Sequence, residues 1–373
     1  MAATIRLKPL HQQVIVITGA SSGIGLVTAR MAAREGAKLV LAARNHEALS
    51  QLEREINAAA NPGTTQAVHV DADVGSEDDV RKIAEAAHTH FGGFDTWVNN
   101  AGASVYGRIE EVSVEDFRRV IDTNFWGVVF GSRAAVEHLK ARGGALINVG
   151  STLSDRAIPL QGIYVASKHA VKGFTDSLRM EIEEANYPIS VTLIKPAAID
   201  TPYTEHAKNY LPHEPKNPPP VYAPETVAKA ILHAAVRPER DIFVGGSGKA
   251  FSVMEKLAPR ATDRYMEATM FGQQQSDEPA DPSRPDGLHA PGRGLAERGG
   301  YGRMGHVAES SLYTKASLHP WITGAILGAA GMAGVAVAAL IRNAGERESR
   351  QRGVRQRVHR GARRLADWRP WND

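Results

Sequence analysis

Residues 14–25 read VIVITGASSGIG, an apolar run that leads directly into a glycine-rich turn. The run VIVIT at 14–18 has the length and composition of a buried strand, and a helix-period pattern follows the turn. Gly19, Gly23 and Gly25 let the chain turn tightly, so the first turn of that helix presents free N–H groups to a phosphate. A glycine cluster alone could be a plain turn, but a strand before it and a helix after it favour a phosphate-binding loop.

The same alternation continues along the chain to about residue 245. Strands are predicted at 14–18, 39–42, 67–71, 96–99, 146–150, 190–194 and 242–244. Helices are predicted near 24–35, 46–59, 77–91, 115–140, 162–187 and 224–236. This order predicts an α/β protein with a doubly wound parallel sheet of about seven strands and helices on both faces, the Rossmann fold. Such sheets bind ligands at the carboxyl ends of their strands.

The composition excludes several classes of chemistry. The 373 residues include no cysteine, which excludes disulfides, thiol catalysis, iron–sulfur clusters and cysteine zinc sites. The net charge is +3, but residues 342–373 alone carry ten Arg and four acidic residues, so the rest of the chain is slightly acidic. We therefore expect no nucleic-acid partner for the body. The 14 His show no metal-binding spacing, and His88 and His90 lie on a polar helix, so we expect no metal.

Arg44 ends the second predicted strand, 19 residues after Gly25. Folds that bind NAD commonly place an acidic residue here for the ribose 2′-hydroxyl, whereas Arg suits a 2′-phosphate. The local sequence LAARN has no acidic residue, which favours NADP(H) and leaves NAD(H) as the alternative. The alternative without a cofactor role is that Arg44 is a solvated side chain at the start of the next helix.

Ser151, Tyr164 and Lys168 form the third motif. Tyr164 and Lys168 are spaced i, i+4 and share one helix face, where the ammonium would favour the phenolate and lower the tyrosine pKa. A tyrosine so tuned can pass a proton to or from a carbonyl or alcohol oxygen, and Ser151, after the fifth strand, can hydrogen-bond the same oxygen. A Tyr-x-x-x-Lys pair alone is usually an ordinary helix surface.

With these motifs together, the chain resembles the short-chain dehydrogenase/reductase family over roughly residues 10–250. TGASSGIG matches the family's TGxxxGxG, and YVASK at 164–168 follows Ser151 by the family's spacing of 13 residues. The other matching positions are Asp73 and Val74, the NNAG motif with Asn100, Ala101 and Gly102, Asn124 in TNFWG, and Pro196, Ile199 and Thr201.

The resemblance implies hydride transfer between a nicotinamide and a carbonyl or alcohol carbon. It implies that Tyr164 is the general acid or base, that Lys168 holds the nicotinamide ribose, that Ser151 orients the substrate oxygen and that Asn124 holds a water. It also implies cofactor contacts from Gly19, Ser21, Ser22, Gly23, Ile24, Gly25, Arg44, Asp73, Val74, Asn100, Ala101, Gly102, Tyr164, Lys168, Pro196, Ile199 and Thr201.

Two positions depart from the family pattern. The usual Pro-Gly after the sixth strand is Pro196-Ala197, and Ala fits there only if its φ is negative. The basic residue that some NADP-dependent members carry in the glycine loop is absent, since Ser21 and Ser22 stand there. The preference for NADP(H) therefore depends on Arg44 alone.

The remaining sequence divides into segments of distinct composition. We predict a catalytic domain over 1–271, with its core at 10–250 and a proline-rich substrate lid at 197–223. Residues 272–316 are rich in Gly, Pro and charged residues and predict a flexible linker. A helical extension follows, with a transmembrane or membrane-associated helix at 317–342 and an Arg-rich amphipathic tail at 343–373.

The run 321–341 has no charge but is rich in Gly and Ala, so a helix buried against a partner is the alternative to a membrane helix. Nucleic-acid binding by the tail is a weaker alternative. We expect a cytoplasmic catalytic domain attached to a membrane.

The sequence thus predicts an NADP(H)-dependent oxidoreductase that acts on a lipophilic secondary alcohol, ketone or aldehyde. The family resemblance implies a dimer or tetramer that forms through the long helices near 115–140 and 162–187. A protein that binds NADP(H) for regulation or as a scaffold, without turnover, is the rival from another class. Epimerisation or dehydration on the same fold is a third possibility.

Overall fold

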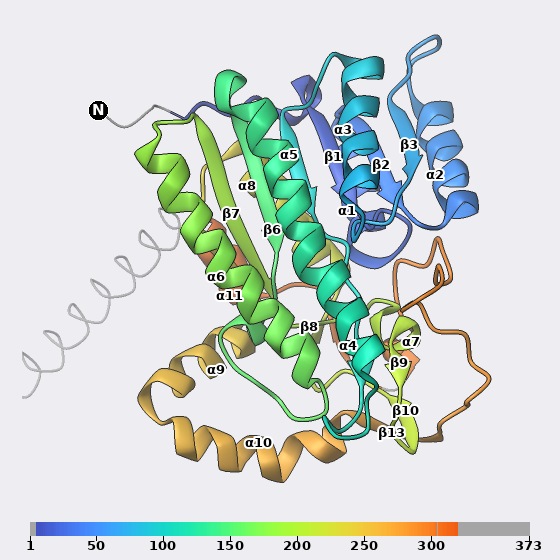
Figure 1. Cartoon of the computed structure of the whole chain (residues 1–373), viewed down its shortest axis with the longest axis vertical. Helices are drawn as coiled ribbons and strands as arrows, with labels where there is room; N and C mark the ends of the chain where they lie inside the picture. The colour runs from blue at the N-terminus through green and yellow to red at the C-terminus, as the bar shows by residue number, and fades with distance from the viewer. Residues whose placement is uncertain (1–4, 304, 320–373) are drawn as a thin grey trace, which may run out of the picture. The chain divides into compact units, whose positions relative to one another are not determined.

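The computed structural model describes residues 5–303 and 305–319. Seven parallel strands form one sheet in the order β12-β7-β6-β4-β1-β2-β3 (Figure 1). Their bounds are β1 Val14–Thr18, β2 Lys38–Ala43, β3 Ala67–Asp71, β4 Thr96–Asn99, β6 Gly144–Val149, β7 Ile189–Pro196 and β12 Asp241–Val244. Each differs from the prediction by at most two residues at either end. The predicted doubly wound parallel sheet is confirmed.

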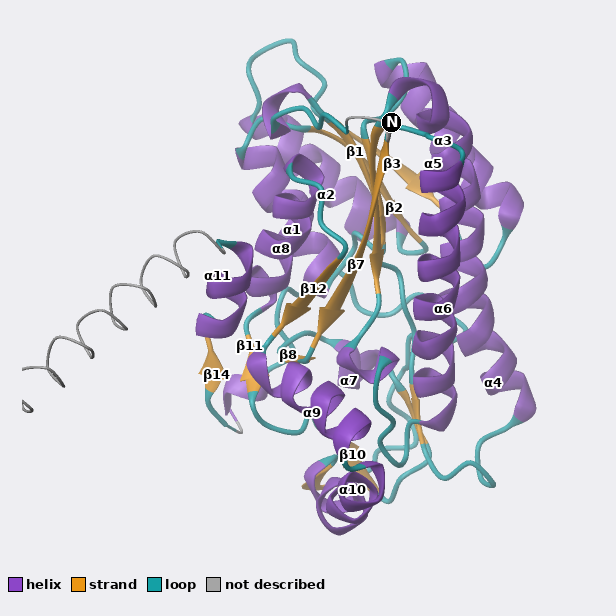
Figure 2. Cartoon of the chain, turned by 90° about the vertical axis from the view of Figure 1, so that its left-hand side faces the viewer, coloured by secondary structure: helices purple, strands orange, loops and turns teal. Residues whose placement is uncertain are grey.

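Helices cover both faces of this sheet (Figure 2). The main helices are α1 Gly23–Arg34, α2 His46–Ala59, α3 Glu77–Phe91, α4 Val114–Ile121, α5 Gly127–Arg142, α6 Gly162–Glu184 and α8 Pro224–Val236. In β1, Ile15 and Ile17 pack in the core with α1, α2 and α8, whereas Val16 packs with α3, α5 and α6. Successive strand residues point to opposite faces, so an all-apolar strand supplies both cores.

The strand order reverses between β1 and β4, because the chain runs outward from β1 to β3 and then returns to β4 on the other side. Crossovers on the two sides of this point leave a crevice at the carboxyl ends of the strands. The loops after β1, β4, β6 and β7 all open into it. The fold thereby brings together the motifs that the sequence analysis singled out.

The long helix predicted at 115–140 is interrupted. A π-helical turn over Asp122–Trp126 separates α4 from α5 and carries Asn124. A π turn inserts one residue into the helical repeat and often marks a functional position. Periodicity did not reveal it, because the helix continues on both sides.

The predicted lid contains several short elements. They are β8 Ala198–Ile199, α7 Tyr203–His206, β9 Lys208–Asn209, β10 His213–Pro215 and β11 Val221–Tyr222. β9 pairs with β5 (Val105–Tyr106), and β8 pairs with β11. The first pairing attaches the lid to the body, and the second joins the two ends of the lid to each other.

The segment predicted as a flexible linker is packed on the body. After α9 (Gly246–Leu257) and α10 (Pro259–Gln273), β13 Gln275–Pro279 pairs with β10. β14 Val307–Ala308 pairs with β11, and α11 (Leu312–Leu318) follows. Residues up to Leu318 form one compact unit. Composition missed this because the segment is ordered mainly by backbone hydrogen bonds and by a few buried apolar residues such as Leu288.

No helix among the described residues is long and apolar enough to cross a membrane. The run 321–341 and the tail 343–373, on which the membrane prediction depends, lie outside the described residues.

Candidate active site

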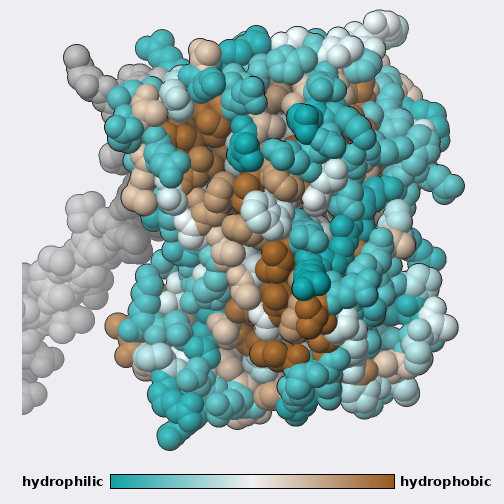
Figure 3. All heavy atoms as spheres, viewed as in Figure 1, coloured by the Kyte–Doolittle hydropathy of each residue, from teal (hydrophilic) through white to brown (hydrophobic). Residues whose placement is uncertain are grey.

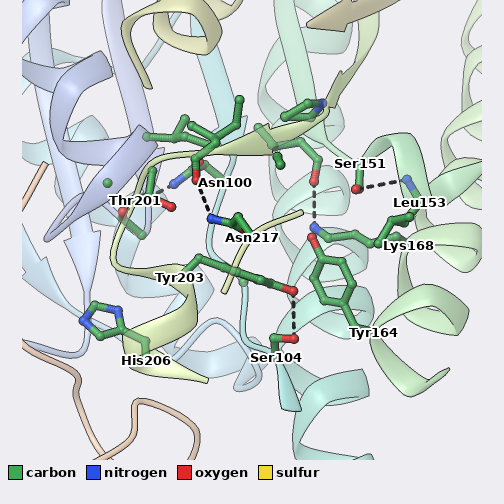
Figure 4. Close-up of a pocket in the computed structure, with 18 of the residues that line it drawn as sticks. Asn100, Ser104, Ser151, Leu153, Tyr164, Lys168, Thr201, Tyr203, His206 and Asn217 are labelled. Carbon is green, nitrogen blue, oxygen red and sulfur yellow. Dashed lines mark hydrogen bonds between the residues drawn. The ribbon is translucent and has the colours of Figure 1, made fainter. Parts of the chain in front are cut away.

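A cavity of about 330 Å³ opens at the carboxyl ends of the strands. Most of the predicted site residues line it, so the glycine loop shares one cavity with the Ser151–Tyr164–Lys168 group. Figure 4 shows Ser151, Tyr164 and Lys168 close together. The predicted residues in its lining are Gly19, Ser21, Ser22, Gly23, Ile24, Arg44, Asp73, Val74, Asn100, Ala101, Gly102, Ser151, Tyr164, Lys168, Pro196, Ile199 and Thr201. Gly25 and Asn124 lie behind this lining.

The glycine loop is packed too tightly for side chains. A Cβ at Gly25 would lie 2.1 Å from the Gly19 carbonyl oxygen, and Gly19 itself has a φ of +67°. The Asn100 side-chain amide donates to the carbonyl oxygens of Thr18 (3.0 Å) and Gly19 (3.3 Å), which holds the loop against the end of β4. The amino end of α1, where the helix dipole is positive, lines the cavity and suits a pyrophosphate, although its Gly23 amide donates to the Ala296 carbonyl at 2.9 Å.

Two guanidinium groups lie at the Arg44 end of the cavity. Arg119 donates to the Asp73 carboxylate at 2.5 Å and to the Leu288 carbonyl at 3.0 Å. Burial opposes ionisation of Asp73, but hydrogen bonds from Arg119 and the Gly75 amide outweigh it and hold the pKa of this carboxyl below its usual range. Burial and the nearby Arg119 lower the pKa of Arg44. An anionic group bound here would relieve this unfavourable proximity of two cations.

Ser151, Tyr164 and Lys168 converge at the other end. Ser151 caps a short 3-10 helix (Thr152–Ser154), and its hydroxyl accepts from the Leu153 amide at 3.0 Å. Tyr164 and Lys168 lie one turn apart on α6, with the Lys168 Nζ 5.7 Å from the tyrosine ring centroid. The ammonium is buried and donates to the Val149 carbonyl at 2.9 Å. The helix repeat thus aligns both side chains as predicted.

The pKa of Tyr164 does not follow the simple expectation. Burial raises it and outweighs the opposing hydrogen bonds with Ser151 and Tyr203. Burial also lowers the pKa of Lys168, to about 8. The same low-polarity surroundings therefore disfavour the charged form of both groups. The i, i+4 spacing correctly predicted that the two side chains lie together. It contained no information about the effect of burial on their pKa values.

Asn124 lies behind the cavity wall and is fully buried. Its Oδ1 accepts from the Ala103 amide at 2.7 Å, and its Nδ2 donates to the Ala103 carbonyl and the Ser167 hydroxyl. The π turn places this amide where it joins the loop after β4 to α6. Asn124 therefore fixes the position of two walls of the cavity.

Pro196, Ile199 and Thr201 form the lid side of the cavity. Ala197, which stands where the family has glycine, is not among the described non-glycine residues with positive φ. Its amide donates to the Val244 carbonyl at 2.8 Å. This departure from the family pattern is therefore compatible with the turn.

The sequence analysis missed a polar network beside Tyr164. The Tyr203 hydroxyl lies 2.7 Å from the Ser104 hydroxyl and 2.8 Å from Gln161 Oε1 (Figure 4). Gln161 in turn donates to the Gln274 side chain at 2.7 Å. The position of Tyr203 two residues after Thr201 was the available signal, but nothing in the sequence indicated the direction of its side chain.

The far end of the cavity is apolar and comes from helices outside the family core. Phe251 of α9 and Met266 and Met270 of α10 line it. Arg156, after β6, fixes these helices through an ion pair with Asp263 at 2.8 Å and a second pair with Glu255. Side chains from two separated stretches of sequence, the loop after β6 and the α9–α10 pair, thus line this end.

Away from the cavity lining, His46, His69 and Asp71 place potential metal-ligand atoms within 4.8 Å of one another. His46 is paired with Asp71 at 2.7 Å, and His69 is paired with Glu53. Both imidazoles thus already have carboxylate partners.

Comparison with known proteins shows where this arrangement occurs elsewhere. The family model described as short chain dehydrogenase matches residues 13–211, more than half of the chain. The chain belongs to the short-chain dehydrogenase family. The resemblance seen in its motifs is confirmed, and with it an oxidoreductase family that binds nicotinamide cofactors.

Several relatives extend this result. The uncharacterized oxidoreductase YxnA of Bacillus subtilis is 50% identical over 326 residues, which covers 87% of this chain and 90% of YxnA. The 11-beta-hydroxysteroid dehydrogenase A of Sesamum indicum is 35% identical over 239 residues, 61% of this chain and 67% of that protein. The alcohol dehydrogenase of Thermococcus sibiricus, solved with 5-hydroxy-NADP, has a TM-score of 0.54 and 27% identity, over 62% of this chain and 95% of its own.

Burial of Lys168 predicts a pH-dependent stability. Its pKa is about 8 in the folded chain and near 10.5 when exposed, so between these values the unfolded chain binds more protons. The free energy of unfolding should rise by on the order of 3 kcal/mol from pH 8 to pH 10.5. In Lys168→Met this rise should be absent, and the variant should be the more stable protein at pH 7.

Urea unfolding at a series of pH values measures this difference. Lys172→Met, one turn further along α6, is the matched control, because Lys172 is partly exposed and paired with Asp176. A Lys168→Met variant that kept the pH-dependent rise of the wild type would contradict the assignment.

Proposed function

We propose that the protein is an NADP(H)-dependent oxidoreductase that exchanges a hydride with a secondary alcohol and ketone, or with an aldehyde. One observation carries the proposal. Ser151, Tyr164 and Lys168 share a cavity with the amino end of α1, so a dinucleotide whose pyrophosphate binds that end would extend toward the three side chains. A hydride donor and a proton donor would then meet at the same substrate group.

When bound, the cofactor supplies or accepts the hydride at its nicotinamide ring. Tyr164 would pass a proton to or from the substrate oxygen, and the Ser151 hydroxyl would hydrogen-bond that oxygen and fix its position. Lys168, held by the Val149 carbonyl, would direct its ammonium to the nicotinamide ribose and favour the phenolate of Tyr164. Below about pH 8 the lysine keeps its charge, so this assistance would be available at neutral pH.

The apolar end of the cavity supports a lipophilic substrate. Phe251, Met266 and Met270 offer apolar surface, and methionine adapts to irregular shapes. Tyr203 and Ser104 offer hydroxyl groups between this surface and Tyr164. The sesame relative is named for a hydroxysteroid, which agrees with an apolar alcohol of this kind.

The rival function is binding of NADP(H) for regulation or as a scaffold, without turnover. Tyr164→Phe separates the two functions, because it removes one hydroxyl and leaves the ring. We expect NADPH binding to stay within a few-fold of the wild type and kcat/KM to fall by about 10²–10⁴.

Fluorescence titration gives the binding, and consumption of NADPH with a panel of hydrophobic ketones and aldehydes gives the rate. Tyr265→Phe, at an exposed position on α10, is the control. Equal rates for Tyr164→Phe and the wild type would remove Tyr164 from the mechanism. If the wild type binds NADPH but turns over no substrate of the panel, the regulatory or scaffold function is favoured.

The preference for NADP(H) is proposed from Arg44, and the Thermococcus structure solved with 5-hydroxy-NADP supports it. A guanidinium at the end of β2 would meet a 2′-phosphate, and a hydrogen bond between charged groups is worth about 1.5–3 kcal/mol. Arg44→Ala should therefore weaken NADPH binding by about 10–100-fold and change NADH binding little.

Calorimetry with both cofactors measures this preference, and Arg34→Ala, at an exposed position on α1, is the control. If Arg44→Ala weakened the binding of NADPH and of NADH equally, a contact between Arg44 and the 2′-phosphate would be excluded.

Self-association and membrane association remain proposals. The face that carries α5 and α6 shows apolar surface (Figure 3). Trp126 in the π turn is 43% exposed and Met180 on α6 is 63% exposed, as expected of a surface that meets a second copy. Membrane association through 317–373 is supported by the sequence pattern alone.

Comparison of the full chain with a chain that ends at Leu318 tests both. Sedimentation velocity should show dimers or tetramers for both chains. Only the full chain should co-sediment with anionic phospholipid vesicles. Monomers would contradict the first proposal, and equal vesicle binding would contradict the second.

A further inference from the structure

Residues 286–300, here named the clasp, lie along the glycine loop at the Arg44 end of the cavity. The Leu295 amide donates to the Ser21 carbonyl at 2.7 Å, and the Gly23 amide donates to the Ala296 carbonyl at 2.9 Å. The clasp belongs to the orange stretch of chain that passes below α2 in Figure 1. A segment from the carboxyl-terminal part of the chain thus borders the motif that begins the fold.

The clasp also holds Arg44. The guanidinium donates to the carbonyl oxygens of Gly287 and Leu288, and the Leu288 carbonyl accepts a second bond from Arg119. The Leu288 side chain is fully buried in a small apolar cluster with Val105, Val112 and Val120. A buried leucine and two carbonyl groups therefore set where the Arg44 side chain lies.

Both ends of the clasp are fastened to the body. Near its start, His289 pairs with Asp116 at 2.6 Å. At its end, Arg298 pairs with Glu225 at 3.0 Å, and the Gly299 amide donates to Asp200 at 3.2 Å. Asp200 directly precedes Thr201 of the lid, so the clasp connects the Arg44 end of the cavity to the lid.

The second half of the clasp contacts the glycine loop directly, whereas its first half borders the cavity. Gly287, Pro291 and Gly292 line the same cavity as Gly19 and Arg44. The clasp therefore forms an outer wall of the cavity at this end. A match of 326 residues to YxnA within this chain of 373 necessarily includes residues 286–300, so the segment is shared with that relative and is not an appended tail.

We propose that the clasp is a wall of the cofactor site, which holds Arg44 for the 2′-phosphate and must lift for the dinucleotide to enter and leave. This inference rests on the proposed function, because it assumes that a dinucleotide occupies the cavity. Much of the attachment of the clasp consists of hydrogen bonds to backbone groups, which can break and re-form without unfolding the sheet. Cofactor exchange is then limited by the motion of the clasp.

The clasp contains a glycine that permits a selective test. A Cβ at Gly294 would lie 2.2 Å from the Cβ of Ala48 on α2, so Gly294→Ala must displace the clasp. Gly302→Ala is the matched control, because a Cβ there meets nothing within 4 Å. Neither substitution changes a residue in the lining of the cavity.

Stopped-flow fluorescence of bound NADPH, chased with excess NADP⁺, measures the dissociation rate in the full chain. We expect Gly294→Ala to release NADPH at least tenfold faster than the wild type and Gly302→Ala, and to lose part of its preference over NADH. Leu288→Ala, which removes the buried side chain that holds the clasp, should likewise speed NADPH release and reduce the preference over NADH. Circular dichroism verifies that each variant is folded.

The outcomes separate this inference from the proposed function. If the wild type binds neither dinucleotide, the proposed function fails and the inference fails with it. If the wild type binds NADPH and both clasp variants release it at the wild-type rate, the inference alone fails. Tighter NADPH binding by Gly294→Ala and Leu288→Ala would also overturn it, because the clasp would then compete with the cofactor.

Discussion

The close contact between the glycine loop and the end of β4 is the constraint on which the site depends. Gly25 lies against the Gly19 carbonyl with no room for a Cβ, and Asn100 fastens this turn through two carbonyl groups. The contact joins β1 to β4, the neighbouring strands at which the order of the strands along the chain reverses. The amino end of α1 consequently faces the same crevice as the loops after β6 and β7.

The sequence was sufficient wherever a regular repeat determines the geometry. The seven strands were located because short apolar runs that alternate with helix-period segments are typical of the buried strands of a parallel sheet. Tyr164 and Lys168 were predicted to lie together because the helix repeat determines that spacing. Ser151 followed from its place after a strand, since all parallel strands end at the same edge of the sheet.

The features that the sequence did not reveal depend on tertiary contacts. The position of Asn124 depends on one π turn, which leaves the hydrophobic pattern on either side unchanged. The direction of the Tyr164 pKa depends on burial by the lid, whose fold was not predicted. The clasp has the composition of a linker, and its order comes from backbone hydrogen bonds and from a few long-range side-chain contacts such as Leu288 with Val105 and Arg298 with Glu225.

The cavity combines two kinds of surface. One stabilises a charged carboxylate, and the other favours the neutral forms of ionisable side chains. Near Arg44, hydrogen bonds from Arg119 and the Gly75 amide stabilise the charge of the Asp73 carboxylate, as its lowered pKa shows. Near Tyr164, the apolar walls disfavour charge on both the tyrosine and the lysine. Because Lys168 is buried and still charged at neutral pH, it lowers the free energy of unfolding there. Functional sites commonly lower stability in this way.

The pairing of β13 and β14 with the lid has a consequence for how the chain can be divided. β10 and β11 are short strands whose backbone groups are satisfied by segments that lie beyond residue 271. A cut at that residue, where the catalytic domain was predicted to end, would leave β10 without its partner β13 and open one edge of β11, and it would remove Leu288 from its apolar cluster. Exposed edges of this kind promote aggregation between molecules. By this criterion, the shortest segment that keeps both edges paired ends at Ala308, the last residue of β14.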